Sequence, residues 1–153
     1  MEIVIILGLI FFNGILSMSE IAMVSARKSR LETAAKKGSK TAKTALRLAN
    51  EPDRFLSTIQ IGITLIGILT GLYSGEALAG DLARWLETIG IPQAHSLTLA
   101  KGIIVILVTY LTLILGELVP KHLGMNAPEK IARLIARPME VLSKIASPFV
   151  WLL

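Results

Sequence analysis

The chain has 153 residues, of which 53% are hydrophobic and 18% are charged, and it contains no cysteine. Its mean hydropathy of +0.66 is too high for a soluble domain of this size, and the length allows one membrane domain and not several. The net charge of +5 is concentrated beside apolar runs, so membrane topology explains it better than nucleic-acid binding. The absence of cysteine excludes disulfides, thiolate metal sites and a cysteine nucleophile.

The first predicted membrane span covers residues 3–26. It begins with the unbroken apolar run Ile3–Phe12 and ends before Arg27 and Lys28. A cleaved signal peptide is disfavoured, because the positive charge follows the apolar run instead of preceding it. Glu20 lies near the end of the span, and an intramembrane carboxylate costs about 2.5 to 3.5 kcal/mol unless it is paired. It is therefore a candidate functional residue.

Residues 27–53 form a basic segment, for which the spacing of Leu and Ala predicts one or two amphipathic helices interrupted near Gly38. Pro52 ends this segment before the second span. We interpret its lysines as a solvated face. By the positive-inside rule the segment is cytoplasmic, which predicts a multi-pass protein of the plasma (inner) membrane with its N-terminus outside and its C-terminus inside.

The second predicted span covers residues 55–75. Its core, Phe55–Tyr73, has no charge and is long enough to cross a hydrocarbon layer of about 30 Å. Glycines recur in it every four residues, a spacing that favours close helix packing or dimerisation. These glycines are Gly67, Gly71 and Gly75.

The third predicted span covers residues 99–119 and carries Glu117 near its end, where Pro120 and Lys121 are expected to stop it. Between the second and third spans, residues 74–83 predict a helical cap, and Gly90–Pro92 predict a turn. Residues 128–147 predict an amphipathic juxtamembrane helix that lies in the membrane interface and is bent by Pro138. The expected fold is an all-α membrane protein with three transmembrane helices.

Polar side chains on the three spans are expected at one depth in the bilayer. At 1.5 Å per residue, Glu20 lies about 10 Å before Arg27, Glu117 about 6 Å before Lys121, and Gln60 about 9 Å after Arg54. Carboxylates with hydroxyls and an amide suit a hard cation such as Mg²⁺, Na⁺ or Ca²⁺. The candidate metal ligands are Ser17, Glu20, Ser57, Gln60 and Glu117.

Structural explanations for the same residues remain open. Serine and threonine in a membrane helix often donate to the carbonyl four residues earlier, as expected for Thr109 and Thr112. Glu20 could pair with Arg27 or Lys28, and Glu117 could cap a kinked helix end beside Lys121.

Three motifs resemble the transmembrane domain of the CorC and cyclin M (CNNM) family of magnesium transporters. They are Asn13–Ala22 (NGILSMSEIA), Phe55–Thr64 (FLSTIQIGIT) and Gly116–Lys121 (GELVPK). The resemblance covers essentially the whole chain. It implies three transmembrane helices, a proline-bent juxtamembrane helix, a homodimer, and a pair of CBS modules with a CorC-type domain downstream.

By position, the resemblance places Ser17 and Glu117 in a Mg²⁺ site inside the membrane. Family members with that site have Gly-Asn in the second helix, where this chain has Gly62 and Ile63. The matching ligand is lost, and Gln60 or Thr64 is the candidate substitute one turn away.

The leading functional hypothesis is a Mg²⁺ exporter or exchanger, with Na⁺ or H⁺ moving in the opposite direction. The alternative is a membrane anchor and dimerisation platform for nucleotide-sensing cytosolic domains, without transport of its own. An enzyme is not predicted, because His95 and His122 fall on opposite sides of the membrane and the sequence has no phosphate loop and no HExxH motif.

Overall fold

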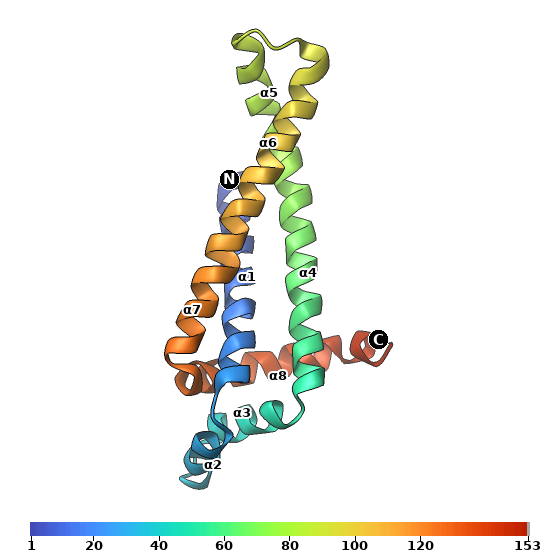
Figure 1. The fold of residues 1–153 in the computed structure, drawn as a ribbon. Helices are drawn as coiled ribbons and strands as arrows, with labels where there is room; N and C mark the ends of the chain where they lie inside the picture. The colour runs from blue at the N-terminus through green and yellow to red at the C-terminus, as the bar shows by residue number, and fades with distance from the viewer. Residues whose placement is uncertain (153) are drawn as a thin grey trace.

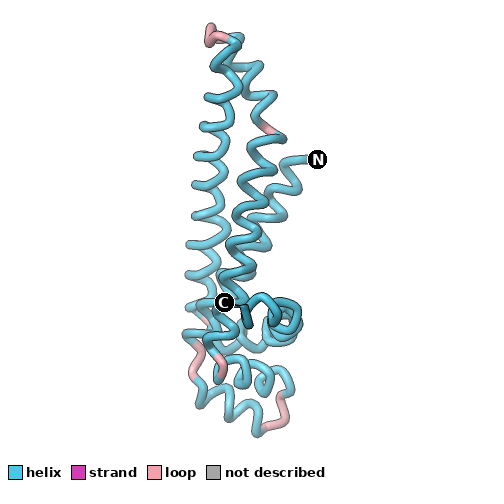
Figure 2. The backbone as a smooth tube through the Cα atoms, turned by 90° about the vertical axis from the view of Figure 1, so that its right-hand side faces the viewer, coloured by secondary structure: helices cyan, strands magenta, loops and turns pink. Residues whose placement is uncertain are grey.

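The protein is built from helices. The computed structural model describes residues 1–152, and within them it contains eight α-helices, one π-helical segment and no strand (Figure 2). This confirms the all-α prediction. Short turns separate the helices, so nearly every backbone amide in the apolar segments has a partner within its own helix, as a bilayer requires.

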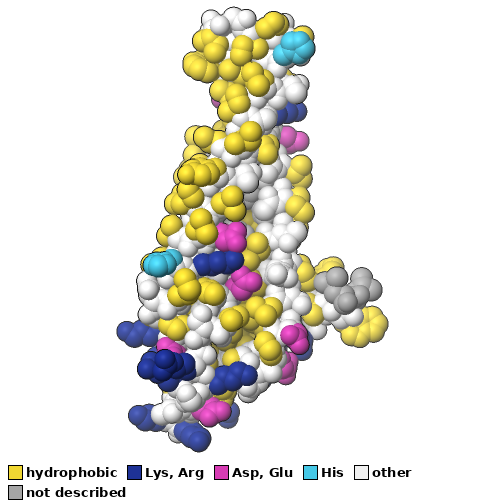
Figure 3. Space-filling model, in the orientation of Figure 1, with side chains coloured by type: hydrophobic (Ala, Val, Ile, Leu, Met, Phe, Trp, Pro, Cys, Tyr) yellow, Lys and Arg dark blue, Asp and Glu magenta, His cyan; other side chains and the backbone are white. Residues whose placement is uncertain are grey.

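Three long helices lie side by side and form the body of the molecule (Figure 1). They are α1 (Glu2–Ser25), α4 (Pro52–Ala77) and a continuous third helix composed of α6 (Gln93–Leu113), η1 (Ile114–Leu118) and α7 (Val119–Asn126). All three are long and apolar enough to cross a membrane, which confirms the three predicted spans. Their exposed surface carries many large apolar side chains and few charges (Figure 3).

The third helix extends beyond the predicted span at both ends. The expectation that Pro120 stops it was wrong, since the helix continues to Asn126. Proline lacks an N–H and its ring crowds the carbonyl four residues earlier. The π-helical turn of η1 precedes the proline, and Val119 donates to the Ile114 carbonyl five residues back. The wider turn therefore carries the helix past the proline.

At one end of the bundle, α4 continues to Ala77, and α5 (Ala79–Thr88) folds back against α6. The predicted cap at residues 74–83 is thus the junction of two helices. Gly90 has a φ of +98°, as the predicted turn at this position requires. Ser96 donates to the Glu87 carboxylate at 2.7 Å and links α6 to α5.

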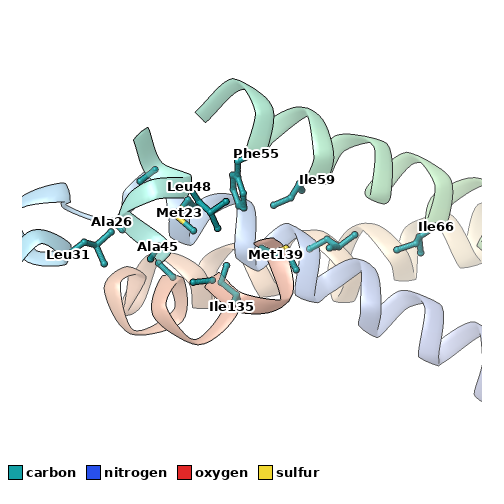
Figure 4. Close-up of a cluster of buried hydrophobic side chains, with 14 residues drawn as sticks. Met23, Ala26, Leu31, Ala45, Leu48, Phe55, Ile59, Ile66, Ile135 and Met139 are labelled. Atoms are coloured by element: carbon teal, nitrogen blue, oxygen red, sulfur yellow. The ribbon is translucent and has the colours of Figure 1, made fainter. Parts of the chain in front are cut away.

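The opposite end, here called the basic end, contains α2 (Lys28–Lys36), α3 (Lys40–Asn50) and α8 (Pro128–Leu152). The α2 and α3 helices separate at Gly38, whose φ is +92°, as the sequence predicts. Both helices and α8 share one hydrophobic core with the ends of α1 and α4 (Figure 4). Its fully buried members include Leu31, Phe55 and Ile59.

The α8 helix crosses the bundle at the basic end and does not run alongside it (Figure 1). Its inner face uses small and flexible residues, Ala132, Ala136 and Met139, whereas Leu134 and Ile145 are exposed. Ile135 is also buried, so the apolar side chains of α8 lie on two faces and not on one. An outward apolar face beside a bundle-facing one fits a helix lying in a membrane interface.

Ion pairs join α8 to the two basic helices. Arg30 pairs with Glu129, and Arg47 pairs with Glu140. Lys144, followed by Arg47, lowers the pKa of the Glu140 carboxyl through hydrogen bonding and charge. Pro138 and Pro148 lie inside α8, and the helix is continuous through both.

The closest helix contacts occur at glycines that the sequence analysis did not single out for packing. A Cβ on Gly124 would lie 2.4 Å from the Ile21 side chain and 2.8 Å from the Met18 carbonyl oxygen. A Cβ on Gly14 would lie 2.9 Å from the Pro120 ring. Backbones can approach this closely only where a side chain is missing. The α1 helix and the η1–α7 segment are therefore packed nearly backbone to backbone.

The glycine repeat of the second span does not mediate close packing between helices of one chain. A Cβ on Gly67, Gly71 or Gly75 would meet no atom within 4 Å among the described residues. Gly67 and Gly71 instead line a groove between α4 and α6, together with Thr109 and Thr112. The expectation of close packing at this repeat was wrong for contacts inside one chain.

Candidate functional site

The two carboxylates predicted at one depth are brought together by a lysine. The Lys121 Nζ atom lies 2.8 Å from Glu117 Oε1 and 3.5 Å from Glu20 Oε2. All three side chains are partly buried, with exposed fractions of 32% for Lys121, 38% for Glu117 and 22% for Glu20. In the described part of the chain, Glu20 therefore pairs with Lys121 and not with Arg27 or Lys28.

Helix geometry explains the contact between Glu117 and Lys121. Glu117 and Lys121 are four residues apart in one helix, in the favourable order with the acid first. The contact between Glu20 and Lys121 depends on the rotation of α1, because Glu20 must face the η1–α7 segment. That orientation is fixed by contacts one and two turns earlier in α1.

The first of these contacts is a hydrogen bond made by Asn13. Pro120 has no N–H, so the carbonyl of Gly116, four residues earlier, lacks its usual helical donor. Asn13 Nδ2 donates to this carbonyl at 3.1 Å, in a buried setting. The bond supplies the partner that the proline removes, and it fixes the rotation of α1 against η1.

Gly14 and Gly116 permit the close approach that this hydrogen bond needs. A Cβ on Gly116 would lie 3.2 Å from the Ile10 carbonyl oxygen and 3.3 Å from Asn13 Nδ2. Backbone atoms cannot move aside as a flexible side chain can, so a larger residue at Gly116 would separate the helices.

Two buried oxygen atoms on α1 have no hydrogen-bond partner within residues 1–152. They are Asn13 Oδ1 and Ser17 Oγ, on side chains that are 4% and 0% exposed. At about 100° per residue, Ser17 lies between Asn13 and Gly14 around α1, and both of those residues contact the η1–α7 segment. A buried polar group without a partner is costly, and a bound water or ion is one of the explanations for such a group in native proteins.

The remaining predicted ligands, Ser57 and Gln60, are not part of this cluster within one chain. They line a shallow hollow on the outer surface of α4, with Thr64, Leu65 and other residues of α4. Gln60 and Thr64 are exposed and Ser57 is partly buried. The structure thus brings Glu20 and Glu117 together through Lys121, buries Ser17 within the bundle, and leaves the α4 residues on a separate face.

The α4 face that meets α1 offers no oxygen at the position where the resemblance expects asparagine. Ile63 packs against the hydrophobic core, and a Cβ on Gly62 would lie 2.8 Å from the Leu16 side chain. At Ile63, where the resemblance implies a ligand asparagine, the side chain therefore makes apolar contact.

Two members of the cluster were not among the predicted ligands. Asn13 entered the sequence analysis only as the first residue of the motif Asn13–Ala22, and Lys121 was treated as a stop signal. A usable signal for Asn13 was the pair Gly116 and Pro120, since a proline four residues after a buried carbonyl requires another donor. Lys121 could have been found from its four-residue spacing to Glu117.

Chemically, Glu20 and Glu117 with the unpartnered oxygens of Asn13 and Ser17 are hard oxygen donors, and the Lys121 ammonium already lies between the two carboxylates. Two carboxylates, an amide oxygen and a hydroxyl suit Mg²⁺ or Na⁺ better than a soft metal. Residues 1–152 contain no group of three or more His, Cys, Asp or Glu side chains placed to hold a metal ion. Any metal bound here would depend on neutral oxygens as well as carboxylates.

Comparison with known proteins gives one family. A family model described as the cyclin M transmembrane N-terminal domain matches residues 4–153. The UPF0053 protein sll0260 of Synechocystis is 47% identical over 153 residues, which are 100% of this chain and 34% of that protein. The UPF0053 protein YhdT of Bacillus subtilis is 32% identical over 99% of this chain and 33% of its own length.

A further relative has an activity in its name. The polyamine export protein of Escherichia coli is 32% identical over 150 residues, which are 98% of this chain and 33% of that protein. The chain thus spans about a third of the length of the curated relatives that it matches.

The hydrogen bond between α1 and η1 predicts a measurable coupling between Asn13 and Pro120. Asn13→Leu should destabilise the protein by about 1 to 2 kcal/mol, because it leaves the buried Gly116 carbonyl without a donor. Pro120→Ala restores a backbone N–H, so the same Asn13→Leu change should cost about 1 kcal/mol less in that background. Unfolding of the four proteins in detergent measures this, and equal costs in both backgrounds would contradict the assignment.

Proposed function

Because the family model covers residues 4–153, this chain belongs to the cyclin M transmembrane N-terminal domain family, and we propose that it is the membrane-embedded part of a Mg²⁺ exporter or exchanger. The chain spans about a third of its curated relatives, so activity of the whole protein is part of the proposal. The export activity named for the E. coli relative supports transport over a catalytic role.

One observation carries the proposal: Glu20 and Glu117 share a cation, the Lys121 ammonium, and the α1 helix that bears Glu20 also bears the buried, unpartnered oxygens of Asn13 and Ser17. Two carboxylates balance the charge of one divalent ion. The neutral oxygens supply further ligands for an ion that loses water reluctantly. Glu117 is the principal proposed ligand, with Ser17 and Glu20 beside it.

A polyamine is the second candidate cargo. The carboxylate pair already binds a primary ammonium group, that of Lys121, and polyamines carry the same group. The name of the E. coli relative points in the same direction. Mg²⁺ is placed first because the amide and hydroxyl oxygens are ligands of hard metal ions.

The proposed orientation follows from the distribution of charge. The basic end carries most lysines and arginines, and the positive-inside rule places that end in the cytoplasm (Figure 3). The N-terminus would then face outward, the C-terminus inward, and the membrane would be the plasma (inner) membrane. The Glu20 and Glu117 cluster would lie near the cytoplasmic side of the bilayer.

We further propose that the chain is a homodimer in which the polar stripe of α4 meets its equivalent. Ser57, Gln60 and Thr64 lie on the outer surface of α4, where lipid would leave a glutamine side chain unsatisfied. Polar side chains stabilise helix association in a membrane by hydrogen bonding across it. In this arrangement Ser57 and Gln60 form hydrogen bonds across the dimer interface.

Transport depends on Glu117 in this proposal. In proteoliposomes, Glu117→Gln should lower Mg²⁺ flux at least tenfold, because the amide keeps the shape of the side chain and removes the charge that binds the cation. The matched control is Glu76→Gln, an exposed residue at the other end of α4, which should transport as the unchanged protein does. Spermidine flux measured in parallel identifies the preferred cargo.

Equal flux for the Glu117→Gln and unchanged proteins would refute the role of Glu117. If the unchanged protein transports neither Mg²⁺ nor spermidine, the alternative of a membrane anchor and dimerisation platform is favoured.

Cysteine cross-linking tests the proposed dimer interface, since the 153-residue chain has no cysteine of its own. Thr64→Cys should form a disulfide-linked dimer on mild oxidation in membranes, because the two α4 stripes face each other. Ile106→Cys on α6 is the control; this residue is 73% exposed and lies outside the stripe. Cross-linking of Ile106→Cys but not of Thr64→Cys or Gln60→Cys would contradict the interface.

A further inference from the structure

Lys121 differs from the other paired basic residues in its position. The ion pairs of Arg30, Arg47 and Lys144 lie at the basic end and that of Arg84 lies on α5, with basic side chains that are 65%, 59%, 72% and 78% exposed. The Lys121 side chain is 32% exposed and lies within the third membrane-spanning helix. Its ammonium contacts both carboxylates of the candidate cation site.

The ammonium uses the same oxygens that a bound cation would need. Lys121 Nζ is at hydrogen-bonding distance from Glu117 Oε1 and within ion-pair distance of Glu20 Oε2. A divalent ion coordinated by these carboxylates would lie within a few ångströms of the ammonium, where like charges repel strongly outside bulk water. Both cations cannot be held between the two glutamates at once.

Starting from the proposed transport function, we propose that Lys121 is a tethered occupant of the cation site that competes with the transported cation. When the cation binds Glu20 and Glu117, the ammonium leaves. When the cation departs, the ammonium returns and neutralises one of the two carboxylates. The empty site then carries one net negative charge instead of two, which lowers the cost of two close carboxylates in an apolar layer.

Lysine suits this role because its ammonium sits on a long, flexible apolar stem. The stem can remain against apolar surface while the charged group moves toward water or lipid headgroups. Lys121 lies five residues before Asn126, the end of α7, which corresponds to about 7.5 Å along the helix axis. The displaced ammonium therefore has a short route to the basic end of the bundle.

Neighbouring features keep the carboxylates in place when the ammonium leaves. The α1 helix remains attached to η1 through Asn13 and Gly116, and to α7 through the close contact at Gly124. These contacts do not involve Lys121. Removal of the ammonium should consequently open the site without separating the two helices.

Lys121→Met tests the competition directly in the purified protein, with Mg²⁺ as the probe. If the ammonium occupies the site nine-tenths of the time, its removal should lower the dissociation constant for Mg²⁺ about tenfold in calorimetric titration. Lys121→Arg, which retains a charge, should bind Mg²⁺ within a few-fold of the unchanged protein. Lys144→Met is the matched control, since Lys144 also pairs with a glutamate four residues earlier, and it should leave the constant unchanged.

A second comparison covers the case in which Lys121→Met does not fold. The Glu20→Gln variant and the Glu20→Gln, Lys121→Met double variant differ only in the ammonium, and the double variant restores the net charge of the cluster. Competition predicts that the double variant binds Mg²⁺ more tightly than Glu20→Gln alone. A structural role for Lys121 predicts equal or weaker binding.

The outcomes separate this inference from the proposed function. If the unchanged protein binds and transports Mg²⁺ but neither Lys121→Met nor the double variant binds more tightly than its parent, competition is refuted and transport stands. If no protein of the series binds Mg²⁺, both proposals fail. Binding by Lys121→Met where the unchanged protein binds weakly or not at all supports the tethered occupant.

Discussion

The hydrogen bond from Asn13 to the Gly116 carbonyl is the contact on which the candidate site depends. It exists because Pro120 removes the helical donor of that carbonyl, and because glycines at positions 14 and 116 let the backbones approach. With α1 held in this rotation, Glu20 faces the same segment as Glu117 and Lys121. Small residues and one buried hydrogen bond thus set the geometry of the charged groups.

The basic end joins the helices at the other end of the candidate site. Helices α2, α3 and α8 share a core with the ends of α1 and α4, and ion pairs to α8 hold them together. Because α8 crosses the bundle with an exposed apolar face, it fits the plane of a membrane interface (Figure 1). A helix held in that plane would set the depth of the three long helices, and with it the depth of the candidate site.

Hydropathy predicted the three spans because a bilayer requires long apolar helices, whatever their contacts. It also singled out Glu20 and Glu117, since charges are conspicuous in apolar runs, and both carboxylates pair with Lys121 in the structure; their role as cation ligands stays a prediction. The rule that proline ends a helix was wrong for Pro120. The π-helical turn that accommodates this proline is a local backbone adjustment, which the residue types do not reveal. The four-residue spacing of Gly67, Gly71 and Gly75 favoured close packing or dimerisation; within one chain a Cβ on any of them would meet no neighbour, and Gly67 and Gly71 line a groove, which only the three-dimensional structure shows.

The most direct test of this account is the position of a bound cation in an experimental structure of the protein. Crystals or single particles prepared with Mn²⁺, a substitute for Mg²⁺ with a clear scattering signal, should show the ion between Glu20 and Glu117, within reach of the Ser17 and Asn13 oxygens. The Lys121 ammonium should have turned away from both carboxylates. An ion bound at Gln60 and Ser57, or a Lys121 that stays between the glutamates at saturating Mn²⁺, would contradict the account.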